Sequence, residues 1–358
     1  MFKIKLYLLV ALSFILVQCS NSNQDSTPEV KNIILLIGDG MGIDHLYAGV
    51  IANKSLNMEN AQYIGLTKTY SANRLITDSG AAGTAIATGT KTKNGSIGVD
   101  ENGNALKSIR AHAQENGLST GLVSVSSITD ATPAAFVANQ VKRTMREEIA
   151  VDFLNSDITL FIGGGRNNFS NRSDERDLLS ELEEKGFKVA HDMESVTNTE
   201  SGKLVGLLTE ANMPRYPERG DFLPQSTETA LRLLSENNKG FFLMVEGSLI
   251  DGGGHSNDLD YVNNEMLDFD NAVKIAFDFA DQNPGTLVVV TSDHETGGMS
   301  ITGGDIKTGE VSATWATSGH SAALVPVMSY GEGAEEFAGI YENTDLFNKM
   351  LSLYNFKN

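Results

Sequence analysis

The 358-residue chain has a single cysteine, Cys19, so no disulfide bond can form within it. It also has few basic residues: 27 Lys and Arg stand against 46 Asp and Glu, which gives a formal net charge of −19. Such a composition does not provide the basic surface that nucleic acids and anionic membranes require. A substrate that is itself an anion would therefore need a local source of positive charge, and bound metal ions are the natural one.

The chain also has no apolar run long enough for a comfortable membrane span. Lys3 and Lys5 precede an apolar segment at residues 6–17, which is the pattern of an export signal. The segment ends in Leu-Val-Gln-Cys, which resembles a bacterial lipobox, although Gln18 stands where a small residue is usual. The N-terminus therefore predicts an exported protein.

We interpret residues 1–19 as a lipoprotein-type signal peptide, with Cys19 as the lipid attachment site. The polar residues 20–28 would form a flexible tether. The alternative is an ordinary signal peptide with an incidental cysteine. The first interpretation predicts a bacterial protein that is periplasmic or anchored by lipid at the cell surface.

The rest of the chain predicts an α/β fold. Apolar, β-branched runs alternate with amphipathic stretches, which is typical of a mostly parallel sheet with helices on both faces. Strands are expected at residues 32–37, 120–125, 159–162, 241–245 and 286–291, and helices at 79–88, 105–115, 146–154, 174–185, 226–237, 260–279 and 344–354. We expect one domain over residues 29–358, with loop-rich excursions at 166–224 and 297–318.

A serine with unusual neighbours begins one of these helices. Ser79 stands between Asp78 and Gly80, and small residues continue to Gly89. A helix N-terminus favours an anion, so this arrangement suits a serine nucleophile. The plainer alternative is a serine that caps a buried helix. Because no histidine lies nearby in the sequence to activate Ser79, metal ions are the expected activator.

Polar side chains follow the predicted strands at the points where the strands end. In open parallel sheets ligands bind beyond these ends, and carboxylates gathered there need cations between them. The carboxylates are those of Asp39, Asp130, Glu246, Asp251 and Asp293, and the histidines in glycine-rich surroundings are His255, His294 and His320. The sequence therefore predicts a site with several metal ions. Three glycines between Asp251 and His255 are expected to form a turn that lets both residues bind one ion.

These motifs, in this order, resemble those of the alkaline phosphatase family over residues 32–354. They are Ile37-Gly38-Asp39-Gly40-Met41-Gly42, Thr77-Asp78-Ser79, Asp130-Ala131-Thr132-Pro133-Ala134-Ala135, Val245-Glu246-Gly247, Asp251 with His255, Ser292-Asp293-His294, and Gly319-His320. The resemblance implies two zinc ions and one magnesium ion. The first zinc would be held by Asp251, His255 and His320; the second by Asp39, Asp293 and His294; and magnesium by Asp39, Thr132 and Glu246, with Asp130 organising its waters.

The resemblance also implies that Ser79 is the nucleophile and that Arg143 binds two phosphate oxygens in a bidentate manner. Without it, Arg143 reads as a solvated residue near a helix start. The implied activity is hydrolysis of small phosphate monoesters through a phosphoserine, with a broad substrate range, an alkaline optimum and a possible homodimer. The alternatives are a phosphodiesterase or sulfatase on the same scaffold, or a zinc-binding lipoprotein without catalysis.

Overall fold

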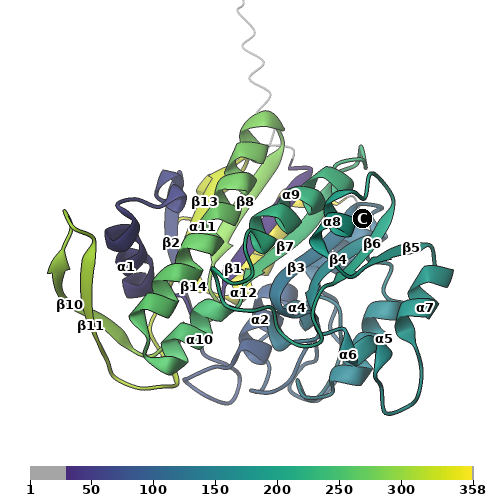
Figure 1. The fold of residues 1–358 in the computed structure, drawn as a ribbon, viewed down its shortest axis with the longest axis horizontal. Coiled ribbons are helices and arrows are strands. Elements are labelled where there is room, and N and C mark those ends of the chain that lie inside the picture. The colour runs from purple at the N-terminus through teal and green to yellow at the C-terminus, as the bar shows by residue number, and fades with distance from the viewer. Residues whose placement is uncertain (1–29, 357–358) are drawn as a thin grey trace, which may run out of the picture.

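The computed structural model describes residues 30–356, which form one ten-stranded sheet with helices on both faces (Figure 1). The predicted signal peptide, Cys19 and the tether lie outside the described residues. The strands follow the order β14-β2-β13-β8-β1-β7-β3-β4-β6-β5, and β13 alone pairs antiparallel with its neighbours. The strands are β1 (Asn32–Gly38), β2 (Tyr63–Lys68), β3 (Ser119–Ser127), β4 (Leu160–Gly164), β5 (Phe187–Ala190), β6 (Lys203–Leu207), β7 (Phe241–Gly247), β8 (Thr286–Thr291), β13 (Val325–Gly331) and β14 (Gly339–Glu342).

The core lies in two layers, one on each face of the sheet. Alternate residues of β1 enter opposite layers: Ile33 and Leu35 pack on one side, and Ile34 and Leu36 on the other. Because both faces are covered, the central strands are buried on both sides and largely apolar. The first layer is covered by α2 (Ser79–Thr88), α3 (Ile109–Glu115), α4 (Ala131–Ala134), α5 (Arg146–Asn155), α7 (Leu178–Glu184) and α12 (Thr344–Tyr354), and the second by α8 (Met193–Thr197), α9 (Phe222–Leu234) and α11 (Leu259–Gln282).

All five predicted strands are present, and the helices at residues 79–88 and 344–354 have the predicted bounds. Other helix ends were predicted wrongly, and at two helices a capping side chain sets the observed start. The Ser108 side chain accepts from the Ala111 amide, so α3 begins at Ile109 and not at residue 105. Asp177 caps α7 in the same way. Helix α9, which has no side-chain cap, spans Phe222–Leu234 and not residues 226–237.

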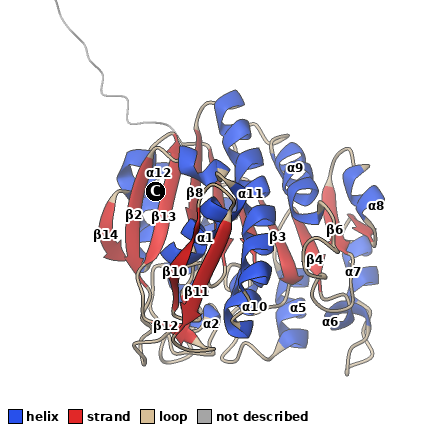
Figure 2. Cartoon of the chain, turned by 60° about the vertical axis from the view of Figure 1, so that its left-hand side comes forward, coloured by secondary structure: helices blue, strands red, loops and turns tan. Residues whose placement is uncertain are grey.

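The two predicted excursions contain secondary structure that the sequence did not indicate. Residues 166–224 include α6 (Asn167–Ser170) and the strands β5 and β6, which extend the main sheet at its edge. Residues 297–318 form most of the hairpin of β10 (Met299–Asp305) and β11 (Glu310–Trp315), which packs on α1 (Ile43–Asn53), as Figure 2 shows. Two short strands, β9 (Glu295–Thr296) and β12 (His320–Ser321), pair at the base of this hairpin.

The glycines after Asp251 form a helix and not the predicted turn. Helix α10 (Leu249–Ser256) packs closely on α11, and a Cβ atom at Gly253 would lie 2.7 Å from a methyl carbon of Val262. Glycine is therefore required by helix packing. The four-residue spacing still places Asp251 and His255 on one helix face. Among residues 30–356, no helix is both long and apolar enough to cross a membrane.

Candidate active site

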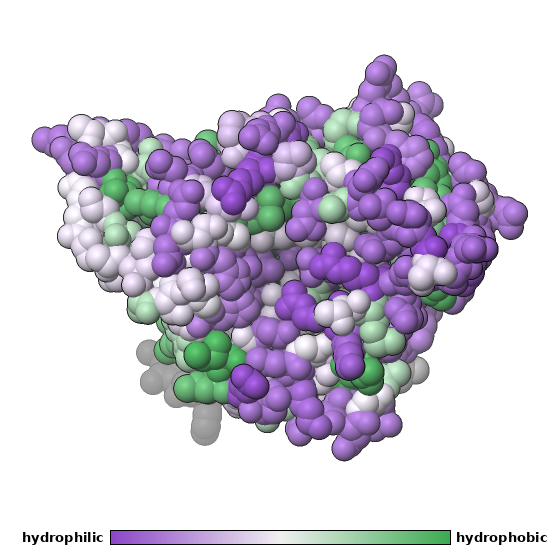
Figure 3. Space-filling model, turned by 60° about the horizontal axis from the view of Figure 1, so that its bottom comes forward, coloured by the Kyte–Doolittle hydropathy of each residue, from purple (hydrophilic) through white to green (hydrophobic). Residues whose placement is uncertain are grey.

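The site lies beyond the carboxyl ends of the central strands, at the lower edge of the sheet in Figure 1. Sheet register explains why distant residues meet there. Ile37 of β1 pairs with Glu246 on one side and with Thr291 on the other, so Asp39 and Asp293 leave adjacent strands at the same level. Seen from this end, the surface is mostly hydrophilic, with hydrophobic residues in small separate patches (Figure 3).

Ser79 is the first residue of α2 and is almost fully buried. The Asp78 side chain caps the helix by accepting from the Ala81 amide at 3.0 Å. Small residues let α2 approach α4, because a Cβ atom at Gly83 would already lie 3.4 Å from the Thr132 Cα. The Ser79 Oγ lies 3.3 Å from the His294 Nε2, so the hydroxyl faces the strand end of β8. Ser79 is therefore not the cap of its helix but its first residue, directed into the site.

The inner group consists of Asp39, Asp293 and His294, all buried. One ligand atom from each lies within 4.8 Å of the other two. The His294 Nε2 is 3.5 Å from the Asp39 Oδ1 and 3.3 Å from the Asp293 Oδ2. Among the described residues, neither of these oxygens has a hydrogen-bond partner. Buried carboxylate oxygens without partners are costly, so the geometry suits a cation between them.

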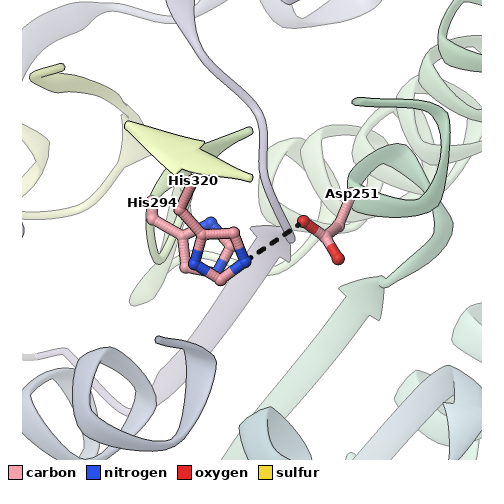
Figure 4. Close-up of side chains that lie close together, drawn as sticks. All are labelled: Asp251, His294 and His320. Carbon is pink, nitrogen blue, oxygen red and sulfur yellow. Dashed lines mark ion pairs between the residues drawn. The ribbon is translucent and has the colours of Figure 1, made fainter. Parts of the chain in front are cut away.

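The outer group is centred on Asp251. Its Oδ2 lies 3.3 Å from the His255 Nε2, and its Oδ1 lies 3.7 Å from the His320 Nε2. The rings of His294 and His320 stack with their centres 3.5 Å apart, so His294 stands next to both groups (Figure 4). Ligand atoms of Asp251, His294 and His320 also lie within 4.8 Å of one another.

Hydrogen bonds behind the three histidines direct the same ring atom toward the carboxylates. The Nδ1 of His255 faces the Ser318 carbonyl at 2.7 Å, and the Nδ1 of His320 faces the Thr77 carbonyl at 2.9 Å. A carbonyl can only accept, so the hydrogen lies on Nδ1 and the Nε2 atom is left for a ligand. This arrangement is the usual one behind metal-binding histidines.

Thr296 orients the His294 ring in the same way and links the inner group to Asp251 of the outer group. Its hydroxyl donates to the Asp251 Oδ1 at 2.5 Å, so its oxygen accepts from the His294 Nδ1 at 3.2 Å. Nothing in the sequence indicates a role for Thr296, because that role depends on two side chains from other parts of the chain.

A third group lies at the side of the site in a cavity of about 200 Å³, which Asp39, Ser79, Thr132, Arg143 and Glu246 help to line. The Thr132 Oγ1 is buried without a hydrogen-bond partner among residues 30–356. The Glu246 Oε2 accepts from the Ser124 hydroxyl at 2.5 Å, which fixes that carboxylate. Oxygen-bearing side chains of Asp39, Thr132 and Glu246 therefore line one cavity, and oxygen is the donor that a hard cation prefers.

Burial and mutual repulsion raise the pKa values of Asp39 and Glu246. Burial raises the pKa of Asp39 well above its ordinary value, and the charges of Asp293, Asp251 and Glu246 raise it further. Burial likewise raises the pKa of Glu246 to about 7, against hydrogen bonds from serines that lower it. A hydrogen bond to Asp251 raises the pKa of His255 to about 9. Bound cations would replace these protons and relieve the repulsion.

Arg143 enters the cavity from the loop before α5. Its two terminal nitrogens lie 3.2 Å from the Asp78 Oδ2 and 3.3 Å from the Asp130 Oδ1. Burial alone would lower the pKa of Arg143, but Asp130 and Asp78 together raise it. Two carboxylates thus hold the guanidinium in its charged form at the cavity that Ser79 also lines.

Asp130 lines the same cavity and lies beside two arginines. Its Oδ1 faces Arg143 and its Oδ2 lies 3.3 Å from an Arg146 nitrogen, and its part in organising magnesium waters stays a prediction. Its Oδ1 also accepts from the Ala131 amide as the cap of α4. In this structure Asp130 orients the arginine. Five further residues contact the predicted site residues, and none of them was predicted as part of the site: Asp78, Ser124, Ser126, Arg146 and Ser248.

Comparisons with known proteins agree with this geometry. A family model described as Alkaline phosphatase matches residues 30–314. Alkaline phosphatase 3 of Bacillus subtilis (strain 168) is 32% identical over 425 residues, covering 94% of this chain and 91% of the relative. Alkaline phosphatase of Escherichia coli (strain K12) is 30% identical over 405 residues, covering 91% of this chain and 86% of the relative.

Solved structures match as well. Alkaline phosphatase from the Antarctic bacterium TAB5 superposes with a TM-score of 0.87 at 41% identity, covering 93% of this chain and 100% of that one. A structure of its mutant His 135 Asp is described with Mg bound in the M3 site and has the same score and coverage.

A parallel sheet whose strand ends hold a buried serine, an arginine and grouped carboxylates and imidazoles defines a metal-dependent hydrolase. The chain belongs to the alkaline phosphatase family. It is accordingly a phosphoric monoester hydrolase.

Replacing Thr296 by valine is expected to weaken metal binding by about tenfold to a hundredfold, because the His294 ring and Asp251 both lose their shared partner. The measurement is zinc retained against increasing concentrations of a chelator. Thr291→Val is the matched control, since this buried threonine of β8 bonds only to backbone carbonyls. Equal zinc retention in Thr296→Val and wild type would contradict the assigned role.

The metal-free protein is expected to lose stability as the pH rises from about 4.5 to 7. Over this interval folded Glu246, with a pKa of about 7, holds a proton that the unfolded chain has released, so the free energy of unfolding falls by ~3 kcal/mol from this group. Urea unfolding of chelated protein at several pH values measures the slope. Glu246→Gln should flatten it, and an unchanged slope in that variant would show that the group titrates elsewhere.

Proposed function

We propose that Ser79 is the nucleophile of this hydrolase and takes the phosphoryl group from a phosphate monoester. The observation that carries the proposal is that Ser79 and Arg143 line one cavity with Asp39 and Thr132, each of which has a buried oxygen without a hydrogen-bond partner in the described part of the chain. A nucleophile, a fixed guanidinium and cation-binding oxygens are the parts that phosphoryl transfer requires.

The residues fit three metal ions. Imidazole and carboxylate donors suit zinc, so Asp251, His255 and His320 would hold one zinc ion, and Asp39, Asp293 and His294 a second. Oxygen donors suit magnesium, so Asp39, Thr132 and Glu246 would hold that ion. The magnesium described for the TAB5 mutant supports this third site. Bound there, the ions would supply positive charge that favours an ionised serine, stabilises a departing alkoxide and acidifies water.

The chain's own groups then account for the two chemical steps. Arg143, held by Asp78 and Asp130, donates two hydrogen bonds to phosphate oxygens and fixes the phosphorus near Ser79. The Ser79 Oγ releases its proton to solvent and bonds to phosphorus while the bond from phosphorus to the ester oxygen breaks, which forms a phosphoserine and an alkoxide that takes up a proton from solvent. Water then attacks the phosphoserine from the side the alcohol has left; the bond from phosphorus to Oγ breaks, phosphate is released, and Ser79 regains a proton from solvent. Because recognition falls on the phosphate group, a broad substrate range is expected.

The test compares p-nitrophenyl phosphate with bis(p-nitrophenyl) phosphate and p-nitrophenyl sulfate, with zinc and magnesium supplied. The monoester should be hydrolysed far faster than the diester or the sulfate. A preference for the diester or the sulfate would favour the other enzymes of this scaffold. Stoichiometric zinc binding without hydrolysis of any of the three would favour the non-catalytic zinc-binding lipoprotein.

We also propose that the protein is exported and anchored by a lipid on Cys19, and that it acts in the periplasm or at the cell surface. The support is the sequence of residues 1–19. Labelling of growing cells with a palmitate analogue tests it: wild type should carry the label and Cys19→Ser should not. A homodimer is a further expectation from the family, and light scattering of the purified protein measures it.

A further inference from the structure

A second hollow, with a volume of about 680 Å³, adjoins the outer metal group and is lined by other residues than the Ser79 cavity. His255 and His320 form part of its wall. Arg74, Leu75, Ile76 and Asn94 form another part of it. The hollow therefore opens directly onto two of the proposed zinc ligands, whereas Ser79 and Arg143 line the separate phosphate cavity.

The wall of this hollow is apolar where most of the surface near the site is polar. Leu75 is 72% exposed and its neighbour Ile76 is 46% exposed. Arg74 precedes them and is exposed as well. Two adjacent aliphatic side chains left in water beside a charged centre are a contact surface without an occupant from the described chain.

This apolar surface is held in a fixed position. The Asn94 side chain donates to the Ile76 carbonyl at 3.1 Å, and the Ser71 amide donates to the Arg74 carbonyl at 3.0 Å. The next carbonyl along the chain, that of Thr77, accepts from the His320 ring at 2.9 Å. The segment that carries Leu75 and Ile76 is thus tied directly to the proposed metal ligand His320.

The geometry of the displacement indicates that the leaving alcohol of the substrate lies against this surface. In an in-line displacement the attacking and leaving oxygens lie on opposite sides of phosphorus. With Ser79 attacking from the inner group, the ester oxygen leaves on the side of Asp251, His255 and His320. The alcohol attached to that oxygen then extends past the two histidines into the second hollow.

We propose that Arg74, Leu75 and Ile76 form a leaving-group subsite, which favours phosphate monoesters of flat, aromatic alcohols. The aliphatic side chains provide apolar contact, and a guanidinium stacks well on an aromatic face. This inference rests on the proposed function of Ser79 and concerns the choice among monoesters. Phosphate esters of small polar alcohols make no apolar contact with this surface and are bound only through their phosphate group.

The experiment measures kcat/KM of the metal-loaded full chain for 2-naphthyl phosphate and for glycerol phosphate. The double variant Leu75→Ser/Ile76→Ser should lower the ratio of the two values by about tenfold, because contact with the ring is lost while the phosphate grip remains. Ile306→Ser is the matched control: this isoleucine is 61% exposed after β10, away from the hollow, and the ratio should stay as in wild type.

Binding without turnover gives a second readout. By calorimetry, 2-naphthylphosphonate should bind wild type more tightly than methylphosphonate does, and the double variant should bind the two compounds equally. An unchanged kcat/KM ratio together with unchanged phosphonate preference would overturn the subsite. Absence of hydrolysis of both esters by wild type would instead overturn the proposed function, so the two failures are distinct.

Discussion

Ser79→Ala is expected to lower phosphate release from p-nitrophenyl phosphate by about a thousandfold or more, because no hydroxyl is left to accept the phosphoryl group. The residual rate would come from water attacking a phosphate that Arg143 still holds. The fold should survive, since the Ser79 Oγ faces the His294 Nε2 at 3.3 Å and the substitution leaves the backbone of α2 unchanged. Steady-state kinetics with saturating zinc and magnesium measure the effect.

Two further measurements make this result specific to the nucleophile. Wild type quenched in acid during turnover should carry one phosphate on the peptide that contains Ser79, and the alanine variant should carry none. Ser170→Ala, at an exposed serine of α6, is the control and should retain full activity. Full activity in Ser79→Ala would require a different nucleophile, such as water acting in a single displacement.

Removal of metal ions is expected to reduce activity by more than about a hundredfold, because the acids around Asp39 then keep protons in place of cations and Ser79 loses its activating charge. Elemental analysis before and after chelation should show zinc and magnesium leaving as activity falls. Full recovery should need both metals, since the third group offers oxygen ligands and the other two offer imidazole. Chelated protein that is free of both metals and fully active would refute the metal site.

The position of the site can be predicted from the sequence better than the hydrogen bonds that hold its side chains in place. Asp39 and Asp293 could be placed together because buried parallel strands are recognisable as apolar runs and end at the same edge of a sheet. Ser79 was recognisable because α2 is built of small residues that pack closely on α4. These signals are local, and they depend on strand and helix patterns that a single chain displays.

Other features depend on contacts between residues far apart in the chain. Thr296 bonds to Asp251, 45 residues away, and Ser124 bonds to Glu246, 122 residues away. Neither pairing leaves a pattern in the sequence around it. The glycines of α10 indicate a turn from the sequence alone because glycine is rare within helices, whereas packing on α11 requires glycine there. The pairing of Asp130 with Arg143 and Arg146 likewise became evident only from the loop geometry.

The short pairing of β9 with β12 determines where this enzyme tolerates inserted residues. Glu295 and Thr296 lie opposite Ser321 and His320, so the ladder closes the base of the hairpin immediately beside the proposed metal ligands. The hairpin beyond that closure packs on α1 and not on the site, and lengthening a closed loop costs little free energy. Insertions at the tip of β10 and β11 are thus insulated from the catalytic geometry, and new surface could be acquired there without altering the chemistry.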